Sequence, residues 1–192
     1  MFNRKLIQSY FHVKRRAWIV LAALTAAGGV AAQPAVRSID VTYEGETYIV
    51  KAQVFAPVPV KTAWAVLTDF QNMAEWVPNV NDSRVVTPGL TQMTIEQRGT
   101  AKFGGLSFPY TSVREIVLDA PKTIRSTQVK GSMKQQKSLM NVSADGSGTL
   151  MRYRLEVVPS LLASAAISAD FLKHEIDEQF TAIVGEMIKR KK

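Results

Sequence analysis

The stretch Lys51–Val86 decides the fold and reads KAQVFAPVPVKTAWAVLTDFQNMAEWVPNVNDSRVV. Its β-branched and aromatic start predicts a strand over 51–55, and Pro57 and Pro59 predict a corner after it. A short helix carrying Trp64, a break near Asp69 and a second helical turn ending at 76–78 should follow. One strand, two short helices and then more strands is an unusual order. A sheet of this kind can hold an apolar cavity when a long helix closes it.

The remaining chain predicts an antiparallel meander. Polar and apolar residues alternate over 92–103, which indicates a strand with one wet and one dry face. Gly104-Gly105 predicts a tight turn, and the Gly/Asp/Pro clusters farther on predict the other turns. The segments 38–43 and 47–55 should form a hairpin or one long bent strand. Further strands are expected over 80–86, 106–118, 122–130, 134–143 and 149–158.

The C-terminal segment from Ala163 to Lys189 predicts a long amphipathic helix, because it lacks proline and has apolar residues at steps of three or four. Such a helix must bury its apolar side, and the concave face of the sheet is the available partner. We therefore expect an α+β fold, a curved antiparallel sheet of six or seven strands around this helix. The apolar stripe consists of Leu162, Ala165, Ala169, Leu172, Ile176, Phe180, Ile183 and Met187.

Residues 1–32 have the pattern of a secretory signal peptide. Five basic residues and no acid precede an uncharged run from Ala17 to Ala32, which ends in small residues. The alternative is an uncleaved membrane anchor, but the apolar run is shorter than the roughly 18 to 20 residues that a bilayer requires. We expect cleavage near Ala31 or Ala32, a single domain over 33–192, and a periplasmic or secreted location of the bacterial type.

The positive charge of the chain is concentrated at its two ends. The chain has 24 Lys and Arg against 16 Asp and Glu. Five of the basic residues precede Ala17 and four form the tail Lys189, Arg190, Lys191 and Lys192, so 15 basic and 16 acidic residues remain between. A nearly neutral body argues against nucleic-acid binding. The basic tail is compatible with transient contact with an anionic membrane surface.

The sequence offers little catalytic or metal-binding chemistry, and we expect no cofactor. It contains no cysteine, which excludes disulfides and thiol catalysis. It also lacks the metalloprotease, serine-hydrolase and phosphate-loop motifs. His174, the only histidine after the signal, should be solvated with Glu178 within reach. Asp69 and Glu75 can be read as paired carboxylates, but a structural role is the usual one for such positions.

The stretch around the two short helices resembles the START-like (SRPBCC) superfamily. The resemblance rests on an Ala-Pro corner at 56–57, Trp64, Thr68-Asp69-Phe70, Glu75-Trp76-Val77-Pro78 and Ser83-Arg84-Val85, with Gly131, Gly148-Thr149, Tyr153 and the terminal helix in support. It covers about Asp40 to Lys189 and includes the polyketide cyclase/dehydrase and coenzyme Q-binding families. It implies the helix-grip fold and a ligand cavity. Function varies widely on this scaffold.

We expect the cavity to lie between the sheet and the helix, with an apolar lining and a few polar groups. Gln97 stands out as a polar residue on a dry strand face, where either a ligand or the protein's own groups could satisfy its amide. Trp64 and Trp76 should lie near the opening. The expected lining residues are Ile95, Gln97, Phe103, Tyr110, Met140, Tyr153, Leu172, Ile176, Phe180 and Ile183.

Three functional hypotheses remain open from the sequence. The first, which we favour, is a non-catalytic binder or carrier of a hydrophobic small molecule such as a lipid, isoprenoid or polyketide-like ligand. The second is a cyclase, dehydratase or hydrolase in which Tyr110, Tyr153 or Arg114 polarises a carbonyl of the substrate. The third is an interaction module whose cavity is filled by its own side chains. No catalytic constellation can be assembled from the sequence, and this favours the binder.

Overall fold

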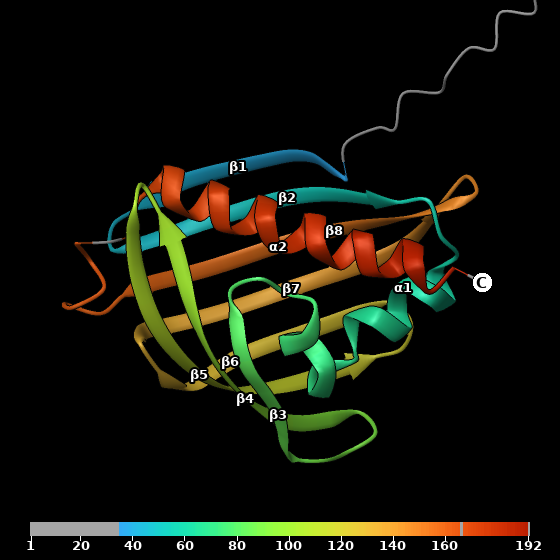
Figure 1. Ribbon diagram of the computed structural model, residues 1–192, viewed down its shortest axis with the longest axis horizontal. Helices are drawn as coiled ribbons and strands as arrows, with labels where there is room; N and C mark the ends of the chain where they lie inside the picture. Colours follow the sequence, from blue (N-terminus) through green and yellow to red (C-terminus); the bar gives the residue numbers. More distant parts are fainter. Residues whose placement is uncertain (1–34, 166, 192) are drawn as a thin grey trace, which may run out of the picture. The chain divides into compact units, whose positions relative to one another are not determined.

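The computed structural model describes residues 35–165 and 167–191. It shows one curved antiparallel sheet with a long helix lying across its concave face (Figure 1). In space the strands follow the order β1-β2-β8-β7-β6-β5-β4-β3, so β1 and β3 form the two edges. The strands are β1 (Val36–Glu44), β2 (Thr47–Ala56), β3 (Val80–Thr87), β4 (Gln92–Phe103), β5 (Leu106–Asp119), β6 (Thr123–Gly131), β7 (Met133–Asp145) and β8 (Gly148–Pro159).

The two short helices explain the unusual element order. β2 pairs with β1 and β8, whereas β3 lies at the opposite edge of the sheet. The chain crosses between these positions through α1 (Val60–Leu67) and the 3₁₀ helix η1 (Phe70–Glu75). Ser83 on β3 donates to the carbonyl of Phe70 at 2.5 Å, which fixes η1 against the edge strand. The predicted order of a strand, two short helices and a strand over Lys51–Val86 is confirmed, and this stretch links the two sides of the sheet.

The sheet has eight strands, where the sequence predicts six or seven. The first two predicted segments form a hairpin rather than one bent strand. Gly45 lies in the turn with a φ of 63°, a conformation that favours glycine, and the register pairs Glu44 with Thr47. The predicted tight turn at Gly104-Gly105 is confirmed, with φ values of 58° and 80°. The α+β class and the helix-grip arrangement are also confirmed.

The C-terminal helix α2 (Ala169–Lys189) begins later than predicted. The start at Ala163 is wrong because Ser168 caps the helix, its side chain accepting a hydrogen bond from the Phe171 N–H at 3.1 Å. Leu162 precedes the helix and is 93% exposed. Apolar residues at helical spacing before Ser168 extended the predicted helix beyond its actual start.

Helix α2 packs unevenly on the sheet. Its closest backbone contacts are with β1, β2 and α1, whereas the middle strands β5 to β7 lie farther from it (Figure 1). Close packing on one side is provided by core residues such as Val50, Val54 and Met151, which are fully buried. On the other side, the wider separation between α2 and the middle strands leaves a space that is either filled by side chains or empty.

Two predictions concern membranes and export. No helix in residues 35–165 or 167–191 combines the length and the apolar character needed to cross a bilayer. The predicted signal peptide at 1–32 lies outside the described residues.

Candidate functional site

A cavity of about 560 Å³ lies between α2 and the strands β4 to β8. This volume falls within the range of small-molecule sites, roughly 300 to 1,000 Å³. The protein's own side chains therefore do not fill the space, in contrast to the third hypothesis. Pro109, Thr111 and Leu162 line the cavity and are also exposed, so it reaches the surface between the start of β5 and the segment that precedes α2.

Most of the predicted lining residues meet at this cavity. Gln97 on β4, Tyr110 on β5 and Tyr153 on β8 reach it from the sheet, and α2 contributes an apolar wall from the opposite side. The lining residues on the strands were predicted from the alternation of polar and apolar residues, and those on the helix from apolar residues spaced three or four apart. The predicted residues that line the cavity are Gln97, Tyr110, Met140, Tyr153, Leu172, Ile176, Phe180 and Ile183.

Four of the predicted residues lie elsewhere in the described structure. Ile95 is fully buried in the core and does not reach the cavity. Phe103 packs edge-on against Phe171, with ring centroids 5.9 Å apart, at the hairpin between β4 and β5. Trp64 and Trp76 are half-buried against the core rather than placed on the cavity wall. Ring size and hydrophobicity do not distinguish a core residue from a lining one.

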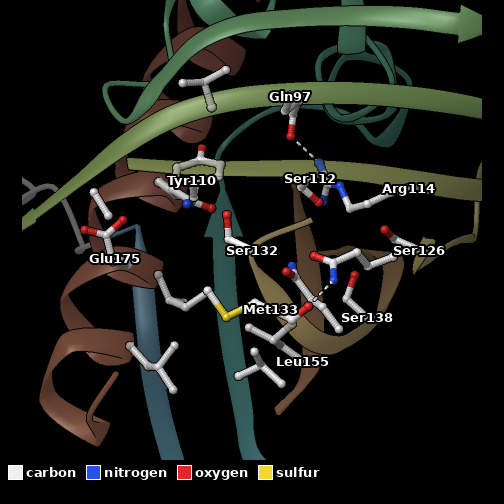
Figure 2. Close-up of a pocket in the computed structure, with 18 of the residues that line it drawn as sticks. Gln97, Tyr110, Ser112, Arg114, Ser126, Ser132, Met133, Ser138, Leu155 and Glu175 are labelled. Atoms are coloured by element: carbon white, nitrogen blue, oxygen red, sulfur yellow. Dashed lines mark hydrogen bonds between the residues drawn. The ribbon is translucent and has the colours of Figure 1, made fainter. Parts of the chain in front are cut away.

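The polar wall of the cavity is richer than the sequence predicted. Alternate residues of β5 line the cavity, namely Phe108, Tyr110, Ser112, Arg114 and Ile116. Figure 2 shows Tyr110, Ser112 and Arg114 among them. Strict alternation along 106–118 was the signal that could have found Ser112, and the sequence pattern identified Arg114 only as a possible catalytic group. The other polar residues of the lining include Ser126, Gln128, Ser132, Gln136, Ser138, Glu175 and Gln179.

Gln97 connects the cavity to the protein's own hydrogen-bond network. Its side-chain nitrogen donates to Ser83 Oγ at 3.0 Å and also contacts the sulfur of Met73 at 3.3 Å. Its oxygen accepts a hydrogen bond from Arg114 (Figure 2). The question that the sequence left open is thereby answered in favour of the protein's own groups. Gln97 orients Arg114, and Arg114 is the group that faces the remaining space.

Arg114 is a half-buried cation without a carboxylate partner, and its Nε atom is fully buried. Its Nε–H has no hydrogen-bond partner, and among the described residues no acidic oxygen lies within ion-pair distance of its guanidinium. Burial lowers the pKa of Arg114, while Tyr153 and Tyr110 act in the opposite direction. A guanidinium stays protonated in proteins, so the charge persists in the cavity.

Two tyrosines flank this guanidinium. Burial raises the pKa of Tyr110 to about 12, and burial likewise raises the pKa of Tyr153, which the nearby Ser138 hydroxyl and Arg114 partly oppose. Both phenols therefore remain protonated at neutral pH and can donate hydrogen bonds. The ring of Tyr110 lies over Gly99 on β4, where a Cβ would collide with it.

A second polar position of the cavity is the carboxyl group of Glu175 on α2. Asn79 donates to Glu175 Oε2 at 2.5 Å, while Glu175 Oε1 and Asn79 Oδ1 are buried without partners. Burial raises the pKa of Glu175, and the bond from Asn79 opposes the shift. Figure 2 shows Glu175 and Arg114 on opposite sides of Tyr110. The cavity thus has an acidic and a cationic position with a phenol between them.

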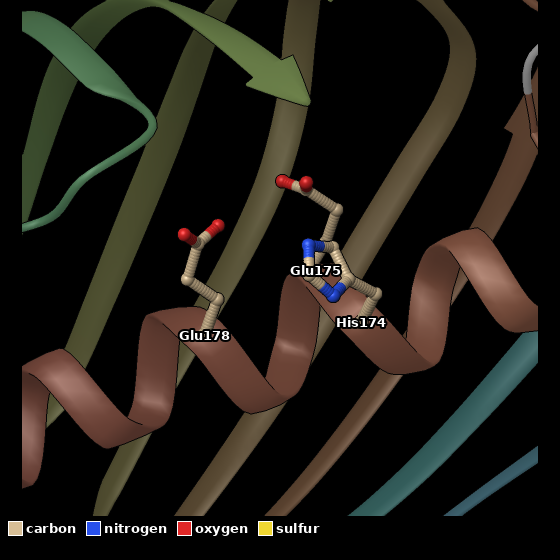
Figure 3. Close-up of side chains that lie close together, drawn as sticks. All are labelled: His174, Glu175 and Glu178. Atoms are coloured by element: carbon tan, nitrogen blue, oxygen red, sulfur yellow. The ribbon is translucent and has the colours of Figure 1, made fainter. Parts of the chain in front are cut away.

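His174, Glu175 and Glu178 lie together on α2, with potential ligand atoms within 4.8 Å of one another (Figure 3). His174 is exposed, as predicted, and its ring lies 5.5 Å from that of Phe103. Glu175 already accepts from Asn79, and adjacent acidic groups occur commonly without a metal. These three side chains alone do not define a metal centre.

The fold and the cavity together define a class of protein. A curved antiparallel sheet that holds a long helix, with an apolar cavity between them, is the helix-grip architecture of START-like proteins. The model of the family described as polyketide cyclase / dehydrase and lipid transport matches residues 47–187. The chain belongs to this family.

Similar solved structures share this fold at low sequence identity. A protein of Thermus thermophilus is 12% identical, with a TM-score of 0.65, and the match covers 75% of this chain and 99% of that one. The Zhui aromatase/cyclase from Streptomyces sp. R1128 is 15% identical, with a TM-score of 0.64 and coverage of 76% and 96%. A STAR-related lipid transfer protein from Xanthomonas axonopodis is 14% identical, with a TM-score of 0.56 and coverage of 78% and 98%.

A comparison with curated protein sequences gives no significant match. The structural neighbours include both a cyclase and a lipid transfer protein. Identities this low establish the shared fold and leave the choice between carrier and enzyme to the site itself.

Proposed function

We propose that this chain is a non-catalytic binding or carrier protein for a hydrophobic small molecule held in the cavity between α2 and the sheet. The observation that carries the proposal is the cavity of about 560 Å³, whose α2 wall is formed by Leu172, Ile176 and Phe180. Burying about 300 Å² of apolar ligand surface would contribute roughly 7 kcal/mol before the costs of association. Micromolar binding therefore requires no further chemistry. Lipids, isoprenoids and polyketide-like molecules fit this description.

Co-purification tests the proposal directly. Native mass spectrometry and organic extraction of the full-length protein, purified from the cells that make it, should reveal a bound apolar compound that is removed by delipidation. A protein that emerges empty and then fails to bind any apolar compound after purification would contradict it.

An enzyme of the cyclase, dehydratase or hydrolase type is the second candidate. Arg114, Tyr110 and Tyr153 present hydrogen-bond donors inside an apolar space, an arrangement that can stabilise negative charge developing on a carbonyl oxygen. Glu175 is the only carboxylate on the described cavity wall. Turnover of polyketide-like or ester substrates, abolished by Arg114→Gln, would favour this candidate over the carrier.

Export is a further part of the proposal and rests on the composition of residues 1–32. The mature protein should accordingly be recovered from the periplasm or medium. Its N-terminus, determined by mass spectrometry, should lie near Gln33. Recovery of the uncleaved chain from the cytoplasm would overturn this part without affecting ligand binding.

Contact of the basic tail with an anionic membrane is a secondary hypothesis. In the structure Arg190 pairs with Asp69 at 2.7 Å and with Glu186 at 2.8 Å, and Lys191 donates to the carbonyl of Pro57. These cations are already engaged with the body of the protein. Their attraction to a membrane should therefore fall below the roughly 1 kcal/mol expected for a free basic residue. Vesicle co-sedimentation with anionic and neutral lipids measures it.

A further inference from the structure

Arg114 and its neighbours form the cationic corner of the cavity. On β4 and β5 the register pairs Gln97 with Ser112, and on β5 and β6 it pairs Arg114 with Gln128. Paired residues project to the same face of a sheet, so these side chains meet on the concave side. We call Gln97, Ser112, Arg114 and Gln128 the guanidinium corner.

The guanidinium corner has hydrogen-bonding capacity that the protein does not use. Gln97 accepts from one terminal nitrogen of Arg114, whereas the Arg114 Nε–H and the Ser112 hydroxyl are buried without partners. Gln128 donates to the carbonyl of Met133 at 2.9 Å, which leaves its own oxygen unpartnered. Unsatisfied buried polar groups and unpaired buried charges are costly, so such a cluster is best explained by a ligand that completes it.

The missing partner should be negatively charged. Removing a guanidinium from water without a counter-ion is unfavourable, and the described residues provide no carboxylate for it. Glu175 is the acidic group of the wall, but it forms no ion pair with Arg114, and Figure 2 shows the two on opposite sides of Tyr110. An anion supplied by the ligand would compensate the charge of Arg114. The protonated hydroxyls of Tyr110 and Tyr153 can add hydrogen bonds to the same group.

The number of cations limits the charge of that anion. Arg114 is the only lysine or arginine among the described residues that line the cavity. A dianionic phosphate would leave charge uncompensated in an apolar surrounding, whereas a carboxylate carries one charge and matches the planar geometry of a guanidinium. The rest of the ligand faces apolar residues such as Met140, Leu155 and Ile176.

We propose that the ligand is an apolar carboxylic acid, with its carboxylate bound at the guanidinium corner and its apolar body lying against α2. This inference rests on the proposed function, because it specifies the ligand of the same cavity. A fatty acid or a polycyclic acid has the required chemistry. A neutral ligand that binds Arg114 only through a carbonyl oxygen is the competing outcome.

The test compares matched ligands that differ only at the head group. Hexadecanoic acid, its methyl ester and hexadecanol compete with a neutral, apolar fluorescent probe for the delipidated full-length protein. We expect the acid to bind at least about tenfold more tightly than the ester or the alcohol at neutral pH. The preference should disappear as the pH falls below the pKa of the bound acid.

Substitutions then assign the preference to Arg114. Arg114→Gln should weaken binding of the acid by about tenfold or more and leave the ester within about twofold, and Arg114→Lys should retain part of the preference. Arg125→Gln removes the same charge from an exposed position on β6 and should change neither ligand. Circular dichroism and thermal unfolding confirm that each variant is folded.

The outcomes distinguish the carboxylate proposal from the carrier proposal. If the acid and the ester bind wild-type protein equally, or if Arg114→Gln weakens both equally, the carboxylate proposal is wrong while the carrier proposal stands. If neither the probe nor any of the three ligands binds, both proposals fail. The wild-type comparison requires no variant, so a poorly folded Arg114 variant does not prevent the test.

Discussion

Arg114 on β5 donates a hydrogen bond to the side-chain oxygen of Gln97 on β4, and this bond places the guanidinium at the cavity (Figure 2). Gln97 is itself fixed through Ser83 to the backbone of Phe70. The chain of contacts runs from η1 through β3 and β4 to Arg114 on β5, at the cavity. The element order that identifies the fold in the sequence therefore also positions the charged group of the site.

Shortening Gln97 should destabilise the protein and disturb Arg114. Gln97→Ala removes the oxygen that accepts from the Arg114 guanidinium and the N–H that donates to Ser83 Oγ, while Ser83 keeps its bond to the Phe70 carbonyl. This loss should cost about 1 to 3 kcal/mol. Urea denaturation measures the free energy of unfolding. Gln92→Ala, at an exposed position on the same strand, is the matched control and should change it by less than about 0.5 kcal/mol. Equal effects of the two substitutions would show that the Gln97 network contributes no stability.

Glu175 should make the protein less stable as the pH rises. Burial raises the pKa of Glu175 in the folded state. The protonated carboxyl group therefore contributes stability that is fully present below the pKa of the unfolded state, and this stability is lost as the pH rises through the pKa of the folded state. Glu175→Gln keeps an oxygen to accept from Asn79 and removes the charge. The variant should exceed wild type in unfolding free energy near neutral pH, with the difference shrinking toward about pH 4. A variant that is less stable at neutral pH would reverse the assigned sign.

Replacing Gly99 and Gly185 by alanine should change the stability of the protein in opposite directions. At Gly99 a Cβ would collide with the carbonyl of Asn79 and the ring of Tyr110, so Gly99→Ala should cost about 1 to 3 kcal/mol. At Gly185, inside α2, nothing lies within 4 Å of the added Cβ, and Gly185→Ala should stabilise the helix by up to about 1 kcal/mol. Thermal unfolding of both variants checks the pair. A tolerated Gly99→Ala would mean that Tyr110 does not pack as described.

Filling the cavity should weaken ligand binding without unfolding the protein. Ser138 on β7 lines the cavity and pairs across the strands with Ser126. Ser138→Phe would place an aromatic ring in the ligand's space, and we expect probe affinity to fall by about tenfold or more. Thr127→Phe, at an exposed position on β6, should leave binding unchanged. Full binding by Ser138→Phe would place the ligand outside this cavity.

Residue patterns predicted much of this structure because they follow from local geometry. Alternation over 92–103 correctly placed Gln97 and Gly99 on the buried face, and helical spacing placed Leu172, Ile176 and Phe180 on one side of α2. The predicted start of α2 was wrong because apolar residues before Ser168 continue the same helical spacing. A capping side chain, rather than periodicity, sets that boundary.

The cavity wall could be predicted only in part. Tyr110 and Tyr153 were identified from strand alternation, whereas Ile95 shares the dry face of β4 and yet belongs to the core. Whether an inward residue meets another side chain or an empty space depends on how far α2 lies from each strand. That distance is a tertiary property, and no pattern within 92–103 contains it.

The central claim is that the space between α2 and the sheet accepts an apolar guest, and a binding titration tests it most directly. Delipidated full-length protein is titrated with a neutral, apolar fluorophore, and affinity and stoichiometry are read from the emission change. We predict saturable binding of one molecule per chain in the micromolar range or tighter, with competition by apolar lipids. A response that never saturates, or that apolar lipids cannot displace, would contradict it.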